Sequence, residues 1–307
     1  MDTPIRQGPG RQAADRQGDG AHMAQMSLDQ VIAQYLAPLS PTTRATYKST
    51  INSWLRWCDL NQLDPLKATA SHIEVYGRYL RAQLGRSVHY QSTSLSIISN
   101  LYKQAHHAGL VPEDPGPYVR RPKVPNHSTG IILERDQARD LLHAAIRDPD
   151  PRLDALTRLL LLNGCRLSEA LNLDIPDHHP GEHPWIRVSR KGGWEQRIGI
   201  TQATSQAITR ITDRRTQGPV FLRGSQRLPK GAARYLIAKL AKRIGLDGIT
   251  PHSLRRTFAT LSREAGVPDP DIIAAAGWVD DTMLNYYDMH HHAIQGKATN
   301  TLSQYLE

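Results

Sequence analysis

Six side chains in the second half of the chain have the types and the order that phosphate-ester chemistry requires: Arg166, Lys191, His252, Arg255, Trp278 and Tyr287. Cationic groups can grip the oxygens of a phosphate diester and neutralise charge that develops at phosphorus. A phenol is a weak nucleophile at its ordinary pKa of about 10, but neighbouring cations favour the phenolate. The set predicts metal-free breakage of a nucleic-acid strand, with the bond energy kept in a protein–phosphate ester.

The first arginine is expected at the start of a helix beside a core element. A dense apolar run over 156–162 predicts a buried helix, which Asn163-Gly164 should end with Gly164 in a left-handed conformation. Arg166 then opens a second helix, where free amides and the helix dipole favour an anion. Glu169, one turn further on, can hold the guanidinium in place. A purely structural Arg–Glu pair remains the alternative for this segment alone.

Lys191 is expected near the tip of a β-hairpin. Residues 185–190 alternate apolar and polar side chains, Lys191-Gly192-Gly193 forms a turn, and residues 195–200 return as a second strand. From such a position a lysine can enter a DNA groove and protonate a leaving oxygen. A lone lysine at a hairpin tip is usually only solvated, so this assignment depends on the other residues of the set.

The segment that begins at Thr250 gives the sharpest local signal. Thr250 is expected to cap a helix with Pro251 in its first position, which puts His252 and Arg255 three residues apart on one face. A histidine and an arginine at a helix start make an anion pocket. A satisfied structural histidine is the competing interpretation.

A further helix is expected from residues 269–270 to Gly277, with Trp278 directly after it. The indole N–H of Trp278 can donate to a phosphate oxygen, although a tryptophan in this position is more often a core anchor. Tyr287 follows nine residues later, with Tyr286 beside it. The cations of the set are what would make either phenol reactive.

Composition and charge agree with a nucleic-acid partner. The 307-residue chain suggests two domains, its formal charge is +9, and its pI is about 9.7. Residues 184–247 hold 14 Lys and Arg against three acidic residues, so the basic excess is concentrated there. That suits a surface that tracks phosphates. An ordinary solvated basic face is the alternative.

Other protein classes fit poorly. Cys58 and Cys165 are the only cysteines, which excludes a disulfide scaffold or a cysteine zinc cluster and fits a reducing compartment. With neither a signal peptide nor an apolar run of roughly 18 residues, we expect a cytoplasmic, nucleoid-associated protein without a membrane partner. Histidines at 178, 179, 183 and 290–292 lack a fixed metal-ligand geometry, so no metal or other cofactor is expected.

Five segments are predicted: a disordered tail over 1–26, a helical DNA-binding domain over 27–115, a linker over 116–128, a catalytic domain over 129–290, and a tail over 291–307 that could dock on another subunit or simply fray. The predicted fold class is α+β, mainly α with a small antiparallel sheet. Contacts with DNA outside the catalytic set are assigned to Arg44, Lys48, Arg120, Arg121, Arg190, Arg197 and Arg256. For Arg44 and Lys48, which lie four residues apart, an ordinary exposed helix face is the alternative.

These motifs resemble the tyrosine recombinase (phage integrase) family. The matching pieces are residues 163–169, 191–193 and 252–255, Gly277-Trp278 and Tyr287, and the match covers roughly residues 129–290. The preceding helical domain resembles the family's SAM-like core-binding domain. Together the two account for all of the chain except its tails.

The resemblance implies a role for each site residue. Arg166 and Arg255 would clamp the non-bridging phosphate oxygens and Lys191 would be the general acid for the 5′-hydroxyl. His252 would assist proton transfer, and Glu169 would support the site. Trp278 stands where many members have a second histidine, so hydrogen bonding survives there without proton transfer. Tyr287 would be the nucleophile, nine residues after that position, in preference to Tyr286.

The resemblance also implies site-specific recombination: two rounds of paired transesterification through a 3′-phosphotyrosyl ester and a Holliday junction, without metal or ATP. The implied partners are double-stranded recombination sites, a dimer of the chain on one site and a homotetramer on two, and possible accessory directionality factors. Two alternatives stay open. One is a type IB topoisomerase-like enzyme that religates the same strand, and the other is a DNA-binding protein that kept the fold and lost catalysis.

Overall fold

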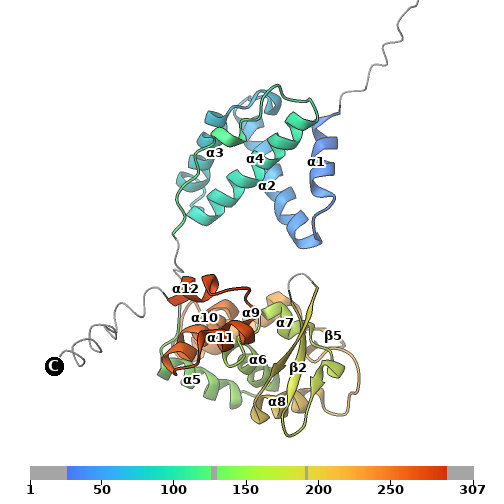
Figure 1. Cartoon of the computed structure of the whole chain (residues 1–307), viewed down its shortest axis with the longest axis vertical. Coiled ribbons are helices and arrows are strands. Elements are labelled where there is room, and N and C mark those ends of the chain that lie inside the picture. The colour runs from blue at the N-terminus through green and yellow to red at the C-terminus, as the bar shows by residue number, and fades with distance from the viewer. Residues whose placement is uncertain (1–25, 126–129, 191–192, 289–307) are drawn as a thin grey trace, which may run out of the picture. The chain divides into compact units, whose positions relative to one another are not determined.

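The computed structural model describes residues 26–125, 130–190 and 193–288, apart from the side chains of the last two residues (Figure 1). The chain divides into two compact units, Met1–Val124 and Pro125–Glu307, called unit 1 and unit 2 below. The division falls inside the predicted linker. The first part of that linker nevertheless belongs to unit 1, because Gly116 and Val119 are buried there.

The described part of unit 1 is built from helices: α1 (Leu28–Leu36), α2 (Pro41–Leu60), α3 (Ala70–Ala82), α4 (Val88–His107) and the short 3-10 helices at Pro65–Lys67 and Gly116–Tyr118. Their starts follow the expected capping chemistry. Ser27 and Gln30 form a capping box at α1, and Pro41 takes the first position of α2. The α4 helix contacts the other three and forms the spine of the unit.

An aromatic cluster fills the centre of unit 1. Trp54 is fully buried, lies 5.3 Å from the Trp57 ring and meets the Tyr76 ring edge-on at 5.2 Å. Its indole nitrogen donates to the Tyr102 hydroxyl at 3.1 Å, and that hydroxyl donates to the Pro65 carbonyl at 2.7 Å. The polar edges of these large rings are therefore satisfied inside the core.

Unit 2 combines helices with small sheets. Its helices are α5 (Arg135–Ile146), α6 (Pro151–Leu161), α7 (Leu167–Asn172), α8 (Gln202–Thr212), α9 (Lys230–Arg243), α10 (Pro251–Glu264), α11 (Asp269–Ala276) and α12 (Thr282–Asp288), with a 3-10 turn at Ile175–Asp177. A three-stranded antiparallel sheet has the order β1 (His178–His179), β2 (Trp185–Ser189), β3 (Glu195–Gly199), and β4 (Leu222–Arg223) pairs with β5 (Gln226–Arg227).

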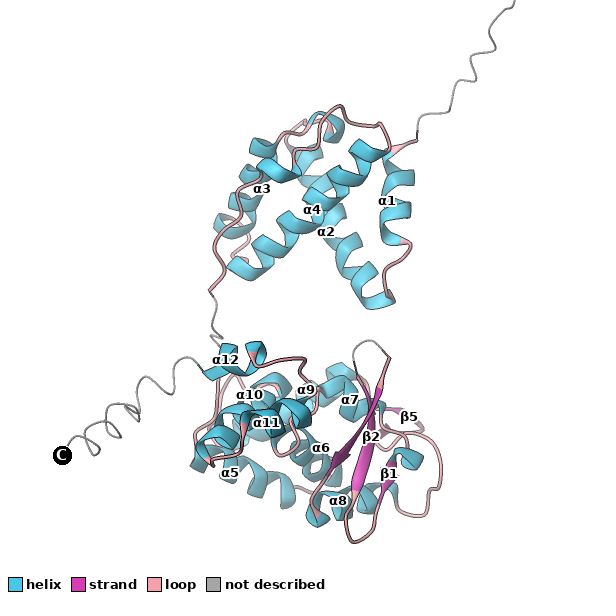
Figure 2. Ribbon diagram, viewed as in Figure 1, coloured by secondary structure: helices cyan, strands magenta, loops and turns pink. Residues whose placement is uncertain are grey.

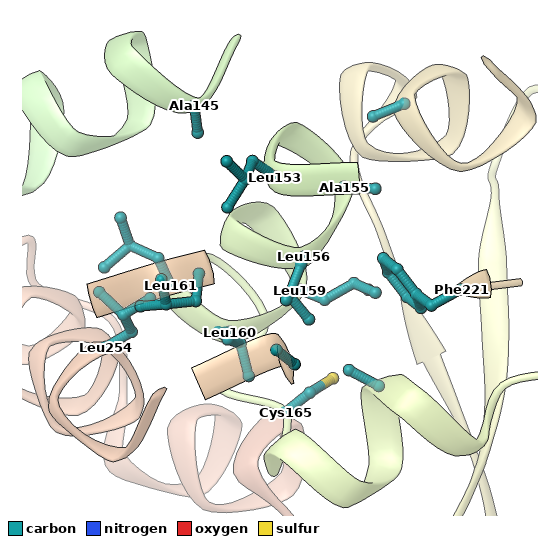
Figure 3. Packing of buried hydrophobic residues seen from close by; sticks show 14 of the residues in the cluster. Ala145, Leu153, Ala155, Leu156, Leu159, Leu160, Leu161, Cys165, Phe221 and Leu254 are labelled. Atoms are coloured by element: carbon teal, nitrogen blue, oxygen red, sulfur yellow. The ribbon is translucent and has the colours of Figure 1, made fainter. Parts of the chain in front are cut away.

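The α6 helix is the centre of the unit 2 core, as its dense apolar run predicts. It packs against α5, α8, α10, α7 and α9. Figure 3 shows Leu156, Leu159 and Leu160 of α6 among Phe221, Leu254 and other buried side chains. The position of α6 therefore determines where the chain leaves the core and continues toward the predicted catalytic residues.

The predicted hairpin is present as β2 and β3, in a register that pairs Trp185 with Gly199 and Ser189 with Glu195 (Figure 2). Ile186, Val188 and Ile198 face the core, which explains the alternation in the sequence. The predicted fold class, mainly helical with a small antiparallel sheet, is confirmed. No helix in the described residues is both long enough and apolar enough to span a bilayer.

Candidate active site

A cavity of about 720 Å³ in unit 2 brings together Arg166, His252, Arg255 and Trp278 from three separate segments of the sequence. Its wall also includes Cys165, Lys230, Arg234 and Met283. Two residues of the predicted catalytic set cannot be placed. Lys191 lies outside the described residues, and of Tyr287 only the backbone, in α12, lies within them.

Arg166 is held at the start of α7 by Glu169. The backbone N–H of Arg166 donates to Glu169 Oε2 at 2.7 Å, and its guanidinium Nη1 donates to Oε1 at 2.7 Å. The Glu169 side chain is 3% exposed, whereas that of Arg166 is 34% exposed. The carboxylate therefore anchors the guanidinium from the protein side and leaves it accessible from the cavity.

Gly164 allows the approach of the second arginine. It has φ of +59°, and a Cβ there would lie 2.4 Å from the Phe258 ring. Its carbonyl accepts a hydrogen bond from Arg255 Nη1. The Asn163-Gly164 stop thus does more than end α6, because it turns a carbonyl toward the α10 helix that carries Arg255 and His252.

The α10 helix begins as predicted. The Thr250 hydroxyl accepts from the Ser253 amide at 3.2 Å, and Pro251 takes the first position. Arg255 is buried, with 3% exposure, and its guanidinium lies 5.0 Å from the centre of the Trp278 ring. A stacked, buried guanidinium keeps its orientation, as a phosphate clamp requires.

The carboxyl end of α11 is the common anchor for the site. Gly277 ends the helix in the left-handed conformation with φ of +62°. Arg255 Nη2 donates to the Ala276 carbonyl at 2.8 Å, and Arg166 Nη2 is 3.4 Å from the Gly277 carbonyl. The last carbonyls of a helix lack intrahelical donors and carry partial negative charge. Cationic side chains satisfy them here, and Trp278 follows directly.

His252 lies in an environment that disfavours its charged form. Although His252 is exposed by surface area, partial burial of its ring, and then the charges of Arg256, Arg255 and Arg166, lower its pKa from the ordinary 6.5 to about 4. The lowered pKa keeps the imidazole neutral at pH 7, so that a ring nitrogen can accept a proton, but it also makes that nitrogen a weaker base. The neutral form is the one that the proton-transfer role implied by the family resemblance requires.

Trp278 is 8% exposed and packs with Phe258, Ile272 and Leu284 in a small apolar cluster. Its indole nitrogen is buried. The core-anchor interpretation of Trp278 is thus confirmed. Donation to a phosphate oxygen stays a prediction, which requires the indole nitrogen to become accessible. Tyr286 packs against the same cluster.

Arg190 was assigned to DNA contact, and that prediction is wrong. Its side chain is 1% exposed and forms an ion pair with Glu169 at 2.8 Å. The alternating strand pattern suggested an accessible arginine beside the turn. Instead the side chain points into unit 2, where Glu169 and the carbonyls of Ala275 and Ala276 accept its hydrogen bonds.

The other predicted DNA contacts stay predictions. Lys48, Arg120, Arg121 and Arg197 are exposed, and the Arg197 guanidinium lies 4.6 Å from the centre of the Trp185 ring. Two residues have structural contacts that the sequence did not predict. Arg44 donates to the carbonyls of Leu36, Ala37 and Leu39 at the end of α1, and Arg256 is half-buried against Gly130.

In residues 184–247, fewer cationic side chains are available to contact DNA than the formal charge suggests. Arg187, Arg210, Arg227 and Arg243 form ion pairs with Asp177, Asp154, Asp174 and Asp148. Much of the excess is therefore balanced by carboxylates earlier in the sequence. Lys230 and Arg234 of α9 remain exposed and line the cavity. Their four-residue spacing after Pro229 is the signal by which they could have been found.

The histidines weighed as metal ligands have other contacts. His178 Nε2 is 2.8 Å from the Ser205 hydroxyl, and His179 stacks on Trp185 with ring centres 3.6 Å apart. Within the described ranges, no group of three or more His, Cys, Asp or Glu side chains is arranged to hold a metal ion. Residues 290–292 lie outside these ranges.

Comparisons with known proteins show the family to which this chain is similar. A model of the phage integrase family matches residues 132–293. The chain is 30% identical over 244 residues to tyrosine recombinase XerC of Pelobacter propionicus, which covers 74% of this chain and 78% of the relative. It is 28% identical over 249 residues to tyrosine recombinase XerD of Corynebacterium glutamicum, with 74% and 81% covered.

Solved structures with the same fold include two of lambda integrase. A dimer bound to a COC′ core site matches with a TM-score of 0.69 and 18% identity, over 87% of this chain and 79% of that chain. A tetramer bound to a Holliday junction matches with a TM-score of 0.69 and 17% identity, over 87% and 78%.

Proposed function

The chain belongs to the phage integrase family and is a tyrosine recombinase, an enzyme that cleaves and rejoins DNA, and we propose that it exchanges strands at specific sites through a 3′-phosphotyrosyl intermediate. The observation that carries this mechanism is the convergence of Arg166, Arg255 and a neutral His252 in one cavity. Two guanidinium groups match the two non-bridging oxygens of a phosphate diester.

In the first step the Tyr287 oxygen attacks the scissile phosphorus. A bond forms between the phenolic oxygen and phosphorus, and the bond from phosphorus to the 5′ oxygen breaks. His252 is neutral and able to accept the phenolic proton, while Arg166 and Arg255 stabilise the added negative charge. We assign protonation of the leaving 5′ oxygen to Lys191. The leaving strand then carries a free 5′-hydroxyl.

In the second step a 5′-hydroxyl of the partner duplex attacks the phosphotyrosyl ester and releases Tyr287. One such exchange gives a Holliday junction, and a second exchange resolves it. The energy of the phosphodiester is kept throughout, so the chemistry needs neither ATP nor a metal ion. The lambda integrase structures, a dimer on a core site and a tetramer on a Holliday junction, support the same assemblies for this chain.

The packing of Tyr286 supports Tyr287 as the nucleophile. Tyr286 is half-buried against the cluster that contains Trp278 and Leu284. Successive residues of a helix point in directions about 100° apart. Tyr286 therefore has a packing role in α12, and we assign the nucleophile to Tyr287.

A nicked suicide substrate tests the proposal, because loss of a short 5′ fragment after cleavage traps the covalent complex. We expect the wild-type chain to form a protein–DNA adduct that survives denaturation and Tyr287→Phe to form none. Tyr286→Phe is the matched control and should retain the adduct. Absence of an adduct with the wild-type chain on its own recombination site, or its persistence in Tyr287→Phe, would contradict the mechanism.

A further inference from the structure

Arg190 occupies a position between the two catalytic arginines, although it does not line the cavity. It follows β2 directly, and its side chain is 1% exposed. Its guanidinium donates to Gln196 Oε1 at 2.9 Å, Glu169 Oε2 at 2.8 Å, and the carbonyls of Ala276 at 3.1 Å and Ala275 at 2.8 Å. A buried guanidinium is tolerated only with such partners, so its orientation is strongly fixed.

Arg190 shares one acceptor with each catalytic arginine. Glu169 accepts from Arg190 and from Arg166, and the Ala276 carbonyl accepts from Arg190 and from Arg255. Displacement of Arg190 would remove one hydrogen bond from Glu169 Oε2, which also accepts from the Arg166 backbone N–H, and one from the Ala276 carbonyl. The acceptors that orient both clamp arginines would then be free to shift.

Gly277 provides the space for this arrangement. Gly277 has φ of +62° and no side chain. A Cβ at this position would collide with the arginine, because it would lie 2.4 Å from Arg190 Cζ. Gln196 of β3 also donates to the Ala274 carbonyl at 2.9 Å. The hairpin is thus joined to the end of α11 at the residues just before Trp278.

We propose that Arg190 is a positioning residue for recombination, which aligns the Arg166 and Arg255 guanidinium groups on the scissile phosphate through Glu169 and the end of α11. The inference rests on the proposed function. It predicts a defect in the cleavage step and not in DNA affinity, because Arg190 itself is inaccessible to the phosphate.

Arg190→Met keeps an unbranched apolar side chain and removes the guanidinium group with its donors. At saturating protein we expect its rate of adduct formation on a suicide substrate to fall about 100-fold, since small misplacements of catalytic groups cost that much. DNA affinity should stay within about threefold of wild type. Arg187→Met is the matched control, because Arg187 lies in β2, three residues before Arg190, and pairs with Asp177. Its adduct rate should match that of wild type.

A substrate with a methylphosphonate at the scissile position separates positioning from general loss of structure. A methyl group replaces one non-bridging oxygen, so the phosphate is uncharged and depends less on the clamp. If Arg190 acts through the clamp, the defects of Arg190→Met and Arg166→Met should both shrink to about tenfold or less on this substrate. A defect of Arg190→Met that stays undiminished while that of Arg166→Met shrinks would overturn the inference.

Two further variants perturb the same contacts from other directions. Gly277→Ala should displace Arg190 and give the same substrate-dependent defect. Arg190→Lys keeps the charge without the planar fork and should recover part of the rate. Wild-type rates in both Arg190→Met and Gly277→Ala would refute the inference while leaving the proposed function intact. Failure of the wild-type chain to form an adduct refutes the proposed function instead.

Discussion

Glu169 is the residue that lets two guanidinium groups lie close together in unit 2. Its carboxylate is almost completely buried and binds Arg166 through one oxygen and Arg190 through the other. Together with Arg255 these groups leave the site with excess positive charge. An anionic phosphate would neutralise that excess, so the charge is present before the ligand arrives and need not be assembled during the reaction.

The pKa of His252 gives a test at the scale of one residue. Because the pKa is lowered to about 4, the imidazole of the free protein stays neutral well below its ordinary range. The second-order rate of adduct formation reports the free enzyme. We expect its pH profile to show no acid limb near pH 6.5 and a decline only as the pH approaches about 4.

Arg256→Gln provides the comparison, because Arg256 is the largest charge contribution to this shift after burial. It should move the acid limb to higher pH, whatever its effect on the absolute rate. The same shift makes unfolded His252 bind a proton between about pH 6.5 and 4 while the folded form does not. His252 therefore lowers the free energy of unfolding as the pH falls through that window. A wild-type acid limb at the ordinary histidine pKa would argue against the lowered pKa of His252.

At the scale of elements, the break between α6 and α7 is the most constrained connection. Gly164→Ala would place a Cβ 2.4 Å from the Phe258 ring at a positive φ. We expect it to lower the free energy of unfolding of unit 2 by about 2–4 kcal/mol, from left-handed strain together with overpacking. The midpoint of urea unfolding measures this change.

Gly231→Ala is the matched glycine control. Gly231 lies in α9, and no atom would contact its Cβ within 4 Å. Alanine there should be neutral or stabilise the protein by about 0.5–1 kcal/mol. Equal midpoints of urea unfolding for the two variants would show that the crowding at Gly164 does not affect the free energy of unfolding.

Local sequence rules predicted the elements better than the contacts between them. Thr250-Pro251, Pro41 and Gly277 lie at helix boundaries because capping and left-handed turns depend on neighbouring residues only. The strand alternation likewise predicted the hairpin. Arg190 was misassigned because the carbonyls of Ala275 and Ala276, which bind it, lie more than 80 residues away. Spacing along the chain carries no information about such acceptors.

At the scale of the whole molecule, each unit has a hydrophobic core of its own. Trp54→Ala should lower the stability of unit 1 by about 3–5 kcal/mol because it removes the fully buried ring at the centre of the aromatic cluster. Hydrogen exchange measured by mass spectrometry should show faster exchange in α2 and α4 and unchanged exchange in α6.

Leu156→Ala is the reciprocal variant in unit 2, where Leu156 is fully buried. It should accelerate exchange in α6 and leave α2 unchanged. Acceleration in both units by either variant would mean that the two cores unfold together. The pair of variants thereby tests whether unit 1 and unit 2 unfold independently of each other.

The end of α11 presents main-chain oxygens, rather than side chains, to the arginines around it. The exposed side chain of Ala274 can therefore vary without removing an acceptor, whereas Ile272 and Ala276 of the same helix are buried in the cluster around Trp278. Length cannot vary in the same way. One inserted residue would rotate every later carbonyl by about 100° and advance it by about 1.5 Å. Recombinase engineering should accordingly treat the exposed positions of α11 as permissive to substitution and the whole helix as intolerant of insertion or deletion.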